Sequence, residues 1–74
     1  MSKEFAQAVG ARLRAVRQQQ GLSLHGVEER SKGRWKAVVI GSYERGDRAV
    51  SIGRLAELAE FYGIPVGELL PEGS

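Results

Sequence analysis

A chain of 74 residues makes a single domain, residues 1–74, and has no room for a doubly wound nucleotide-binding sheet, whose βαβ units need about 30 residues each. Hydrophobic residues form 42% of the chain and charged residues 27%, as in globular proteins, and the lack of cysteine excludes disulfides and thiolate metal sites. The net charge is +2, and the sequence has neither a membrane-spanning apolar run nor a signal-peptide core, so we expect a cytoplasmic protein.

The first predicted element is an amphipathic helix over residues 3–20. Its apolar positions recur at spacings of four, four and three residues, as one face of an α-helix requires: Phe5, Val9, Leu13 and Val16. Gly21 follows, and glycine commonly lies just past a helix end. Gly10 inside the helix costs roughly 1 kcal/mol relative to alanine, which suggests that a neighbouring element approaches closely there.

A second, short helix is predicted over residues 24–30. Ser23 is a suitable N-cap, and Leu22 and Val27 are placed to form a hydrophobic staple across the helix start. The helix must be short because residues 31–33, Ser-Lys-Gly, have the composition of a turn.

The third element is ambiguous. Residues 37–41, AVVIG, resemble a buried strand running into a glycine turn, but an isolated strand between helices would have no pairing partner. We therefore predict a helix over residues 36–44, because tertiary packing outweighs helix propensity. Its core face is expected to carry Val39, Ile40 and Tyr43, and its other face largely Ala37, Gly41, Ser42 and Arg45. Trp35, just before the helix, either stacks on a nucleotide or packs in the core, and we favour the core.

Two further helices are predicted after residue 50. Ser51 is the N-cap of a broadly apolar helix that Gly63 ends, and we expect this helix to lie at the centre of the core. Pro65 suits the first turn of a last helix over residues 65–70, which Pro71 terminates. The predicted fold is therefore an all-α, compact five-helix bundle.

The two short helices and the glycine-containing turn between them form a predicted helix-turn-helix over residues 23–44. The second helix of such a unit can enter the DNA major groove, which is wide enough for one helix. Basic residues flank this helix on both sides: Arg34, Lys36, Arg45 and Arg48. Residues 30–54 carry a net charge of +5, whereas residues 55–74 carry −4, so an anionic partner is expected at the middle of the chain.

Two alternative sites are poorly supported. Gly41 and Gly46 have the spacing of a phosphate-binding loop, but Asp47 and Arg48 follow where that loop needs lysine and a hydroxyl residue. His25 is the only histidine, and without cysteine it cannot complete a zinc or thiol site. We therefore expect no enzyme activity, no catalytic residue, no cofactor and no metal site.

The segments LRAVRQQQGLS, SYERGDR and LAELAEFYGIPVGELL resemble the Cro/C1-type (XRE) DNA-binding domain, and the resemblance covers about residues 10–70. It implies a lambda-repressor-like fold and a bacterial transcriptional regulator, acting as a repressor, that binds double-stranded DNA at the nucleoid. We also expect a homodimer on a pseudo-palindromic operator, with no membrane and no small-molecule substrate for this domain. The alternative is a protein-interaction module with the same helical fold, in which the basic face is incidental.

The resemblance also implies roles for individual residues. Arg17 matches the family's arginine that pairs with a glutamate ending the recognition helix, here Glu44, so a partly buried ion pair is expected. The base-reading positions of the family fall on Ala37, Val38 and Ser42. With their neighbours and the flanking polar residues, the candidate DNA-contacting set is Ser23, His25, Arg34, Lys36, Ala37, Val38, Gly41, Ser42, Arg45 and Arg48.

Alanine and valine at reading positions leave the source of sequence specificity open. Both can touch a thymine methyl group, but neither can make the bidentate hydrogen bonds that read guanine or adenine. Polar readout then comes from Ser42, Arg34, Lys36 or His25, or specificity arises indirectly through DNA shape. The turn before the helix is also longer than usual in the family, which leaves the exact register of the reading positions open.

Overall fold

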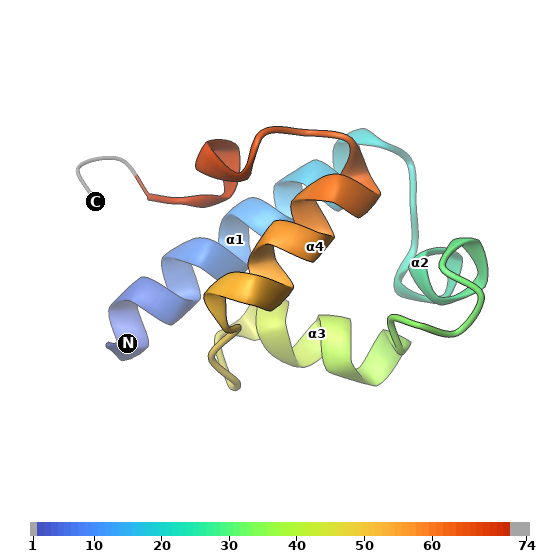
Figure 1. Cartoon of the computed structure of the whole chain (residues 1–74). Coiled ribbons are helices and arrows are strands. Elements are labelled where there is room, and N and C mark those ends of the chain that lie inside the picture. Colours follow the sequence, from blue (N-terminus) through green and yellow to red (C-terminus); the bar gives the residue numbers. More distant parts are fainter. Residues whose placement is uncertain (1, 72–74) are drawn as a thin grey trace.

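The computed structural model describes residues 2–71, and in this range the chain forms four α-helices and one 3-10 helix, without strands (Figure 1). Their bounds are α1 (Lys3–Gln19), α2 (Leu24–Arg30), α3 (Ala37–Arg45), α4 (Ile52–Tyr62) and η1 (Val66–Leu69). The all-α class is confirmed, and the AVVIG segment is helical. None of these helices combines the length and the apolar composition that crossing a bilayer requires.

The prediction of a fifth α-helix is wrong, because this segment forms a 3-10 helix. Residues 66–69 form a single 3-10 turn, so the described part of the fold has four α-helices. Pro65 precedes the turn with an extended backbone at ψ 140°, and Leu70 follows it at ψ 139°. Only four residues lie between these extended positions, too few to establish a run of α-helical hydrogen bonds.

Local signals determine where the α-helices begin and end. The N-cap roles predicted for Ser23 and Ser51 are confirmed, and Ser2 adds a third. Each serine hydroxyl accepts a hydrogen bond from the backbone N–H three residues ahead, at 2.9, 3.2 and 3.1 Å respectively. Gly46 and Gly63 end α3 and α4 in the left-handed conformation, with φ of 76° and 71°. The observed bounds of α1 and α3 consequently differ from the predicted ones by a single residue.

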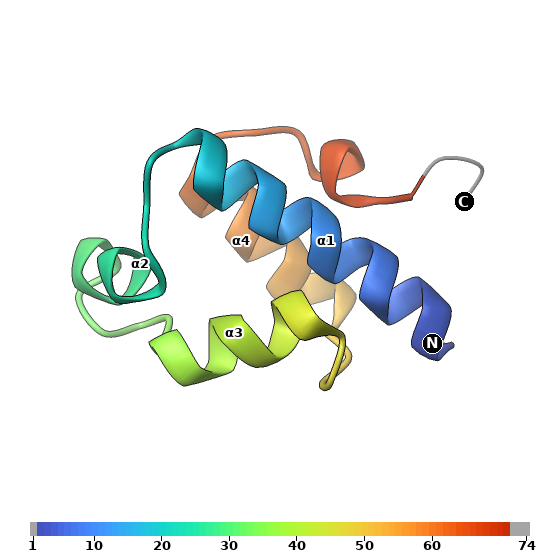
Figure 2. The ribbon, with the colours of Figure 1, turned by 180° about the vertical axis from the view of Figure 1, so that it is seen from behind.

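The helices pack around α1 and α3. α4 lies in front of α1 in Figure 1 and behind it in Figure 2, while α3 runs below both and α2 lies at the N-terminal end of α3. α1 and α3 come close together at Gly10. A Cβ atom added there would collide with the backbone carbonyl oxygens of Tyr43 and Glu44. The close neighbour that a glycine in the first helix suggested is therefore α3.

The hydrophobic core draws on every element. Ile40 and Tyr43 are buried, so the middle of the apolar run supplies the inward face of α3. Trp35 is also buried, as we favoured from the sequence. The cluster comprises Val9, Leu13, Val27, Trp35, Ile40, Tyr43, Val50, Leu55, Leu58, Ala59, Tyr62 and Leu69. With one side of α3 in this core, the other side is left to face outward.

Candidate nucleic-acid interface

Helices α2 and α3 are joined by a turn that its own hydrogen bonds define. The Ser31 hydroxyl donates to the carbonyl oxygen of Glu28 at 3.1 Å and accepts from the backbone N–H of Trp35 at 3.0 Å. Lys32 and Gly33 follow one another in the left-handed conformation, with φ of 56° and 82°. These features let the chain change direction between the two helices.

A carboxylate from α2 caps the start of α3. The backbone N–H of Ala37 donates to Oε1 of Glu28 at 2.7 Å, whereas Lys36, the N-cap residue, offers no side-chain hydrogen bond. The sequence gives no sign of this contact, because a contact between two helices leaves no periodic signal. This carboxylate ties α2 to α3 and offsets part of the positive potential at the helix N-terminus.

Arg17 and Glu44 form an ion pair between α1 and the C-terminal end of α3. Nε and Nη2 of Arg17 donate to the two carboxylate oxygens of Glu44 at 2.7 and 2.9 Å, and Nη1 donates to the carbonyl oxygen of Leu22 at 2.8 Å. The side chains are only 11% and 5% exposed. The hydrogen bond to Glu44 raises the pKa of the Arg17 guanidinium, although burial opposes this. The pair therefore anchors α3 to α1 at the end opposite the Glu28 cap.

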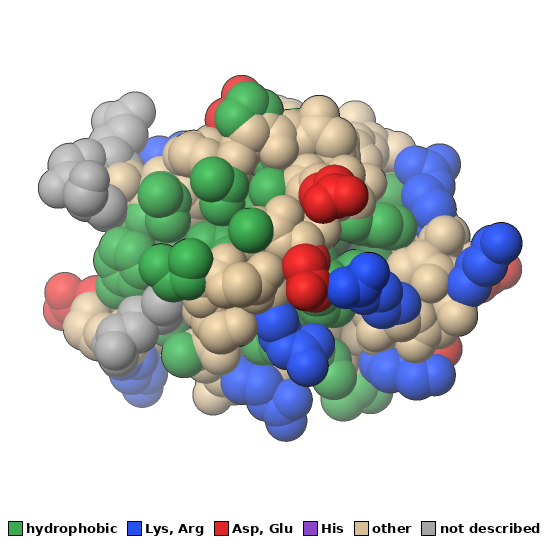
Figure 3. Space-filling model, viewed as in Figure 1, with side chains coloured by type: hydrophobic (Ala, Val, Ile, Leu, Met, Phe, Trp, Pro, Cys, Tyr) green, Lys and Arg blue, Asp and Glu red, His purple; other side chains and the backbone are tan. Residues whose placement is uncertain are grey.

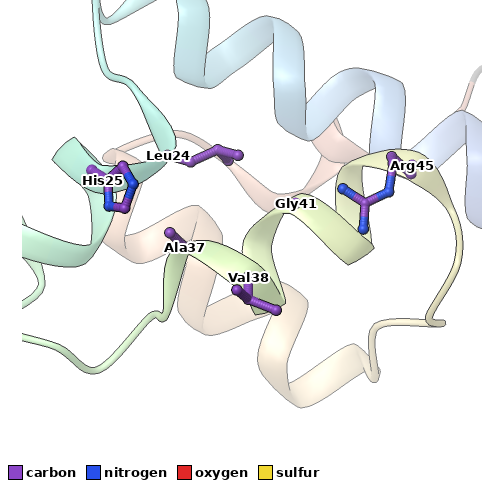
Figure 4. A pocket seen from close by; sticks show the side chains of 6 residues that line it. All are labelled: Leu24, His25, Ala37, Val38, Gly41 and Arg45. Carbon is purple, nitrogen blue, oxygen red and sulfur yellow. The ribbon is translucent and has the colours of Figure 1, made fainter.

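An open hollow of about 320 Å³ lies between α2 and the outward side of α3 (Figure 4). Its lining residues are Leu24, His25, Ala37, Val38, Gly41 and Arg45. Figure 4 shows His25 and Arg45 at its two ends, with Leu24 of α2 between them. Val38 is 81% exposed, but Ala37 is only 8% exposed and Gly41 is buried. Ala37 and Gly41 therefore lie at the base of the hollow, beside Leu24 of α2, and are shielded from solvent more than Val38 is.

Basic side chains gather along the edge of the molecule that α2 and α3 form, which is the lower and right edge in Figure 3. Lys36 and Arg48, which flank α3, are exposed, and so is His25 of α2. Arg45 is exposed as well, and it donates to Asp47 at 2.9 Å. Exposed ion pairs contribute only about 0–1 kcal/mol, so Arg45 can exchange its partner for a phosphate at little cost.

Arg34 does not line the hollow. Its Nη2 donates to Oε2 of Glu57, in α4, at 2.7 Å. Its guanidinium carbon lies 5.5 Å from the centroid of the Trp35 ring. The structure therefore brings Arg34 toward α4 and does not bring it together with the residues that line the hollow.

Two serines of the candidate set already make internal hydrogen bonds. The Ser42 hydroxyl donates to the carbonyl oxygen of Val39 at 2.7 Å, and the Ser23 hydroxyl accepts from the backbone N–H of Gly26 at 2.9 Å. The oxygen of Ser42 still has a lone pair with which it can accept from a base amino group.

Arg14 of α1 is a basic residue that sequence reasoning missed. It is exposed and lines a second hollow, which it shares with Gly41 and Arg45. One signal could have found it: Arg14 lies one helical turn before Arg17, on the part of α1 that contacts α3. Arg14 adds positive charge beside the C-terminal half of α3.

The chemistry of this region suits binding. Among residues 2–71 no three His, Asp or Glu side chains gather as a metal site requires. The region instead offers exposed cationic donors around the apolar residues of α3 that line the hollow, Ala37, Val38 and Gly41. Cationic donors match phosphate oxygens, and apolar groups match the methyl-bearing edges of bases.

Comparison with known proteins assigns the chain to a family. The helix-turn-helix domain model matches residues 8–72, and the chain belongs to this family. A solved structure described as the "Crystal structure of the DNA-binding domain of BldD" is 76% identical, with a TM-score of 0.95, and the match covers 96% of this chain and 100% of that one. A second, described as the "Structure of the S. venezulae BldD DNA-binding domain", is also 76% identical, with a TM-score of 0.90 over 92% of this chain and 99% of that one. Comparison with curated proteins gives no match.

The similarity to BldD is visible in the sequence itself. The run GLSLHGVEERSKGRWKAVVIGSYERGDRAV, residues 21–50, contains the whole helix-turn-helix unit and resembles the N-terminal domain of that regulator. The two structural matches confirm this resemblance.

Proposed function

We propose that this chain binds double-stranded DNA sequence-specifically as the DNA-binding part of a transcription regulator, with α3 in the major groove. The observation that carries this proposal is the geometry of α3. Its inward side is packed against α1, while its outward side presents Val38 and is surrounded by exposed basic side chains. The similarity to two structures described as BldD DNA-binding domains supports the same function.

The side chains around α3 divide into two roles in this proposal. Lys36, Arg45 and Arg48 are exposed cations at the two ends of α3, where they contact phosphates and set the register of the helix. Val38 and Ser42 lie on the part of α3 that meets base edges. No catalytic step, cofactor or small-molecule substrate is part of this function.

The proposed binding unit is a homodimer on a pseudo-palindromic operator. Helix-turn-helix dimers place their two recognition helices in half-sites about one helical turn apart, ~34–36 Å. A dimer on such a site excludes other proteins from the same grooves, so repression is the regulatory effect we propose. This function places the chain at the nucleoid, in the cytoplasm.

Salt dependence tests DNA binding against the alternative of a protein-interaction module. If α3 and its flanks contact about six phosphates, affinity for duplex DNA should fall roughly a thousandfold between 50 and 200 mM salt. Lys36→Ala and Arg48→Ala should make this dependence less steep. Failure to bind any duplex at low salt would favour a protein partner instead.

Selection of bound duplexes from a random pool tests which residues read bases. We expect Val38→Ala and Ser42→Ala to change the preferred sequence, because both residues lie on the outward part of α3. Arg34→Ala is the matched comparison, since Arg34 points toward α4. It should lower affinity evenly or not at all, and a changed sequence preference would show that Arg34 turns toward the bases.

A further inference from the structure

We propose that the hollow between α2 and α3 receives the C5-methyl group of a thymine, and that this contact sets the base preference at the start of α3. The proposal rests on the proposed function, because it requires α3 to lie in the major groove.

The lining of the hollow is apolar where a base edge would meet it. Leu24, Ala37, Val38 and Gly41 contribute no polar side-chain group. Val38 is also 81% exposed, which makes it the most exposed large hydrophobic side chain of the described chain. Exposed apolar surface of this kind gains free energy when a methyl group covers it. In the major groove the thymine methyl is the apolar group that a base presents.

Gly41 keeps the hollow open without a packing reason inside the chain. Glycine within a helix costs roughly 1 kcal/mol relative to alanine. A Cβ at this position would meet only the guanidinium end of Arg45, at 3.1 Å, and Cδ1 of Leu24, at 3.5 Å. Arg45 is a flexible surface side chain, so the fold would tolerate alanine. The space above Gly41 is therefore better explained by a group that enters from outside.

Two hydrogen-bond donors beside the hollow are already engaged. The N–H of Ala37 donates to Glu28, and the hydroxyl hydrogen of Ser42 donates to Val39. The remaining donors are His25 and Arg45 at the two ends of the hollow, shown in Figure 4. Their positions suit contacts with phosphates on either side of a methyl group that is buried in the apolar part of the hollow.

Replacing single thymines by deoxyuridine in the selected operator tests the proposal, because this change removes only the C5-methyl group. Dissociation constants are measured for each substituted duplex. One thymine in each half-site should weaken binding about fourfold when it loses its methyl group, since burying one such carbon contributes about 0.8 kcal/mol. The other thymines should have little effect.

Variants of the hollow then locate the contact. Val38→Ala removes one wall of the hollow, and Gly41→Ala fills its floor. In both variants the duplexes with thymine and with deoxyuridine at that position should have nearly equal dissociation constants. Val66→Ala makes the same change on η1, outside the hollow. This variant should keep the fourfold difference between the two dissociation constants. Unchanged folding of each variant is checked by its melting temperature.

The failures of the two proposals are distinguishable. An operator whose thymines can all be replaced by deoxyuridine without loss of affinity overturns the methyl site and leaves DNA binding intact. A methyl effect that survives in both Val38→Ala and Gly41→Ala also overturns it, because another part of the protein then reads the methyl group. Failure to bind any duplex overturns the proposed function as well.

Discussion

The two flanks of α3 differ in how tightly the rest of the protein holds them. On the α1 side, Gly10 lets the two backbones touch, and the Arg17–Glu44 pair makes two short hydrogen bonds. On the α2 side, one capping bond from Glu28 is followed by an open hollow. Since a helix that reads DNA must be rigid on one side and accessible on the other, this asymmetry is the structural basis of the proposed function.

The largest expected effect comes from breaking the ion pair on the tight flank. Glu44→Ala leaves the guanidinium of Arg17 buried without its carboxylate partner. Loss of one member of such a buried pair typically costs about 3–5 kcal/mol in the free energy of unfolding, which urea denaturation measures. Glu29→Ala, an exposed acid on α2, should change stability by less than about 0.5 kcal/mol. Equal stability of the two variants would contradict the anchoring role of the pair.

A matched pair of glycine substitutions compares the two flanks directly. Gly10→Ala places a methyl group against the backbone of α3 and should destabilise the fold by about 2–3 kcal/mol, as overpacking does. Gly41→Ala, on the open flank, meets only side-chain atoms and should be neutral or stabilising by up to about 1 kcal/mol. Thermal melts of both variants supply the comparison. If both changes cost the same, the flanks do not differ in packing.

Tyr62 makes the stability of the fold depend on pH. Its hydroxyl is buried and has no hydrogen-bond partner within the described part of the chain. Burial, reinforced by the Glu44 charge, raises the pKa of Tyr62 from 10.0 to about 12. The folded state therefore holds this proton more tightly than the unfolded state. The stability that this provides is complete below pH 10 and is lost as the pH rises toward 12.

Tyr62→Phe tests this linkage. Between pH 10 and 12 the wild-type free energy of unfolding should fall by about 2 kcal/mol more than that of the variant, at about 1.4 kcal/mol per pH unit for one group. At neutral pH the variant should be as stable as the wild type or slightly more so, because it removes a buried hydroxyl without a partner. Parallel curves for the two proteins above pH 10 would rule out this role of Tyr62.

The smallest expected effect on stability comes from changing Glu28, which caps α3 on the open flank. Glu28→Gln keeps an oxygen acceptor for the N–H of Ala37 but loses the charge, so stability should fall by about 1 kcal/mol. The same change removes a negative charge near the groove. Affinity for duplex DNA should therefore rise roughly two- to fivefold, which corresponds to ~0.3–1 kcal/mol of helix-dipole interaction. Glu29→Gln on the same helix is the control, and a loss of affinity in Glu28→Gln would contradict this account.

Features that depend on adjacent residues could be predicted from the sequence. Ser23 and Ser51 cap their helices through N–H groups three residues away, and Gly46 and Gly63 end helices through their own backbone conformation. The helical nature of the AVVIG run followed from its neighbours, because a lone strand would have had no partner.

Features that depend on the angle between helices could not be predicted from the sequence. Ala37 and Gly41 fall on the outward side of a helical projection, but α2 leans over them. Arg34 pairs with Glu57, which lies 23 residues further along the chain. The helix predicted over residues 65–70 is only a 3-10 turn over Val66–Leu69, with Pro65 extended just before it, because the span before Leu70 is short.

The most direct test of the account is a chemical footprint on the selected operator with dimethyl sulfate, which methylates guanine N7 in the major groove and adenine N3 in the minor groove. Bound protein should protect guanine N7 in two half-sites whose centres lie about 10 base pairs apart, and adenine N3 there should stay reactive. Protection of adenine N3 with guanine N7 still reactive would contradict the placement of α3 in the major groove.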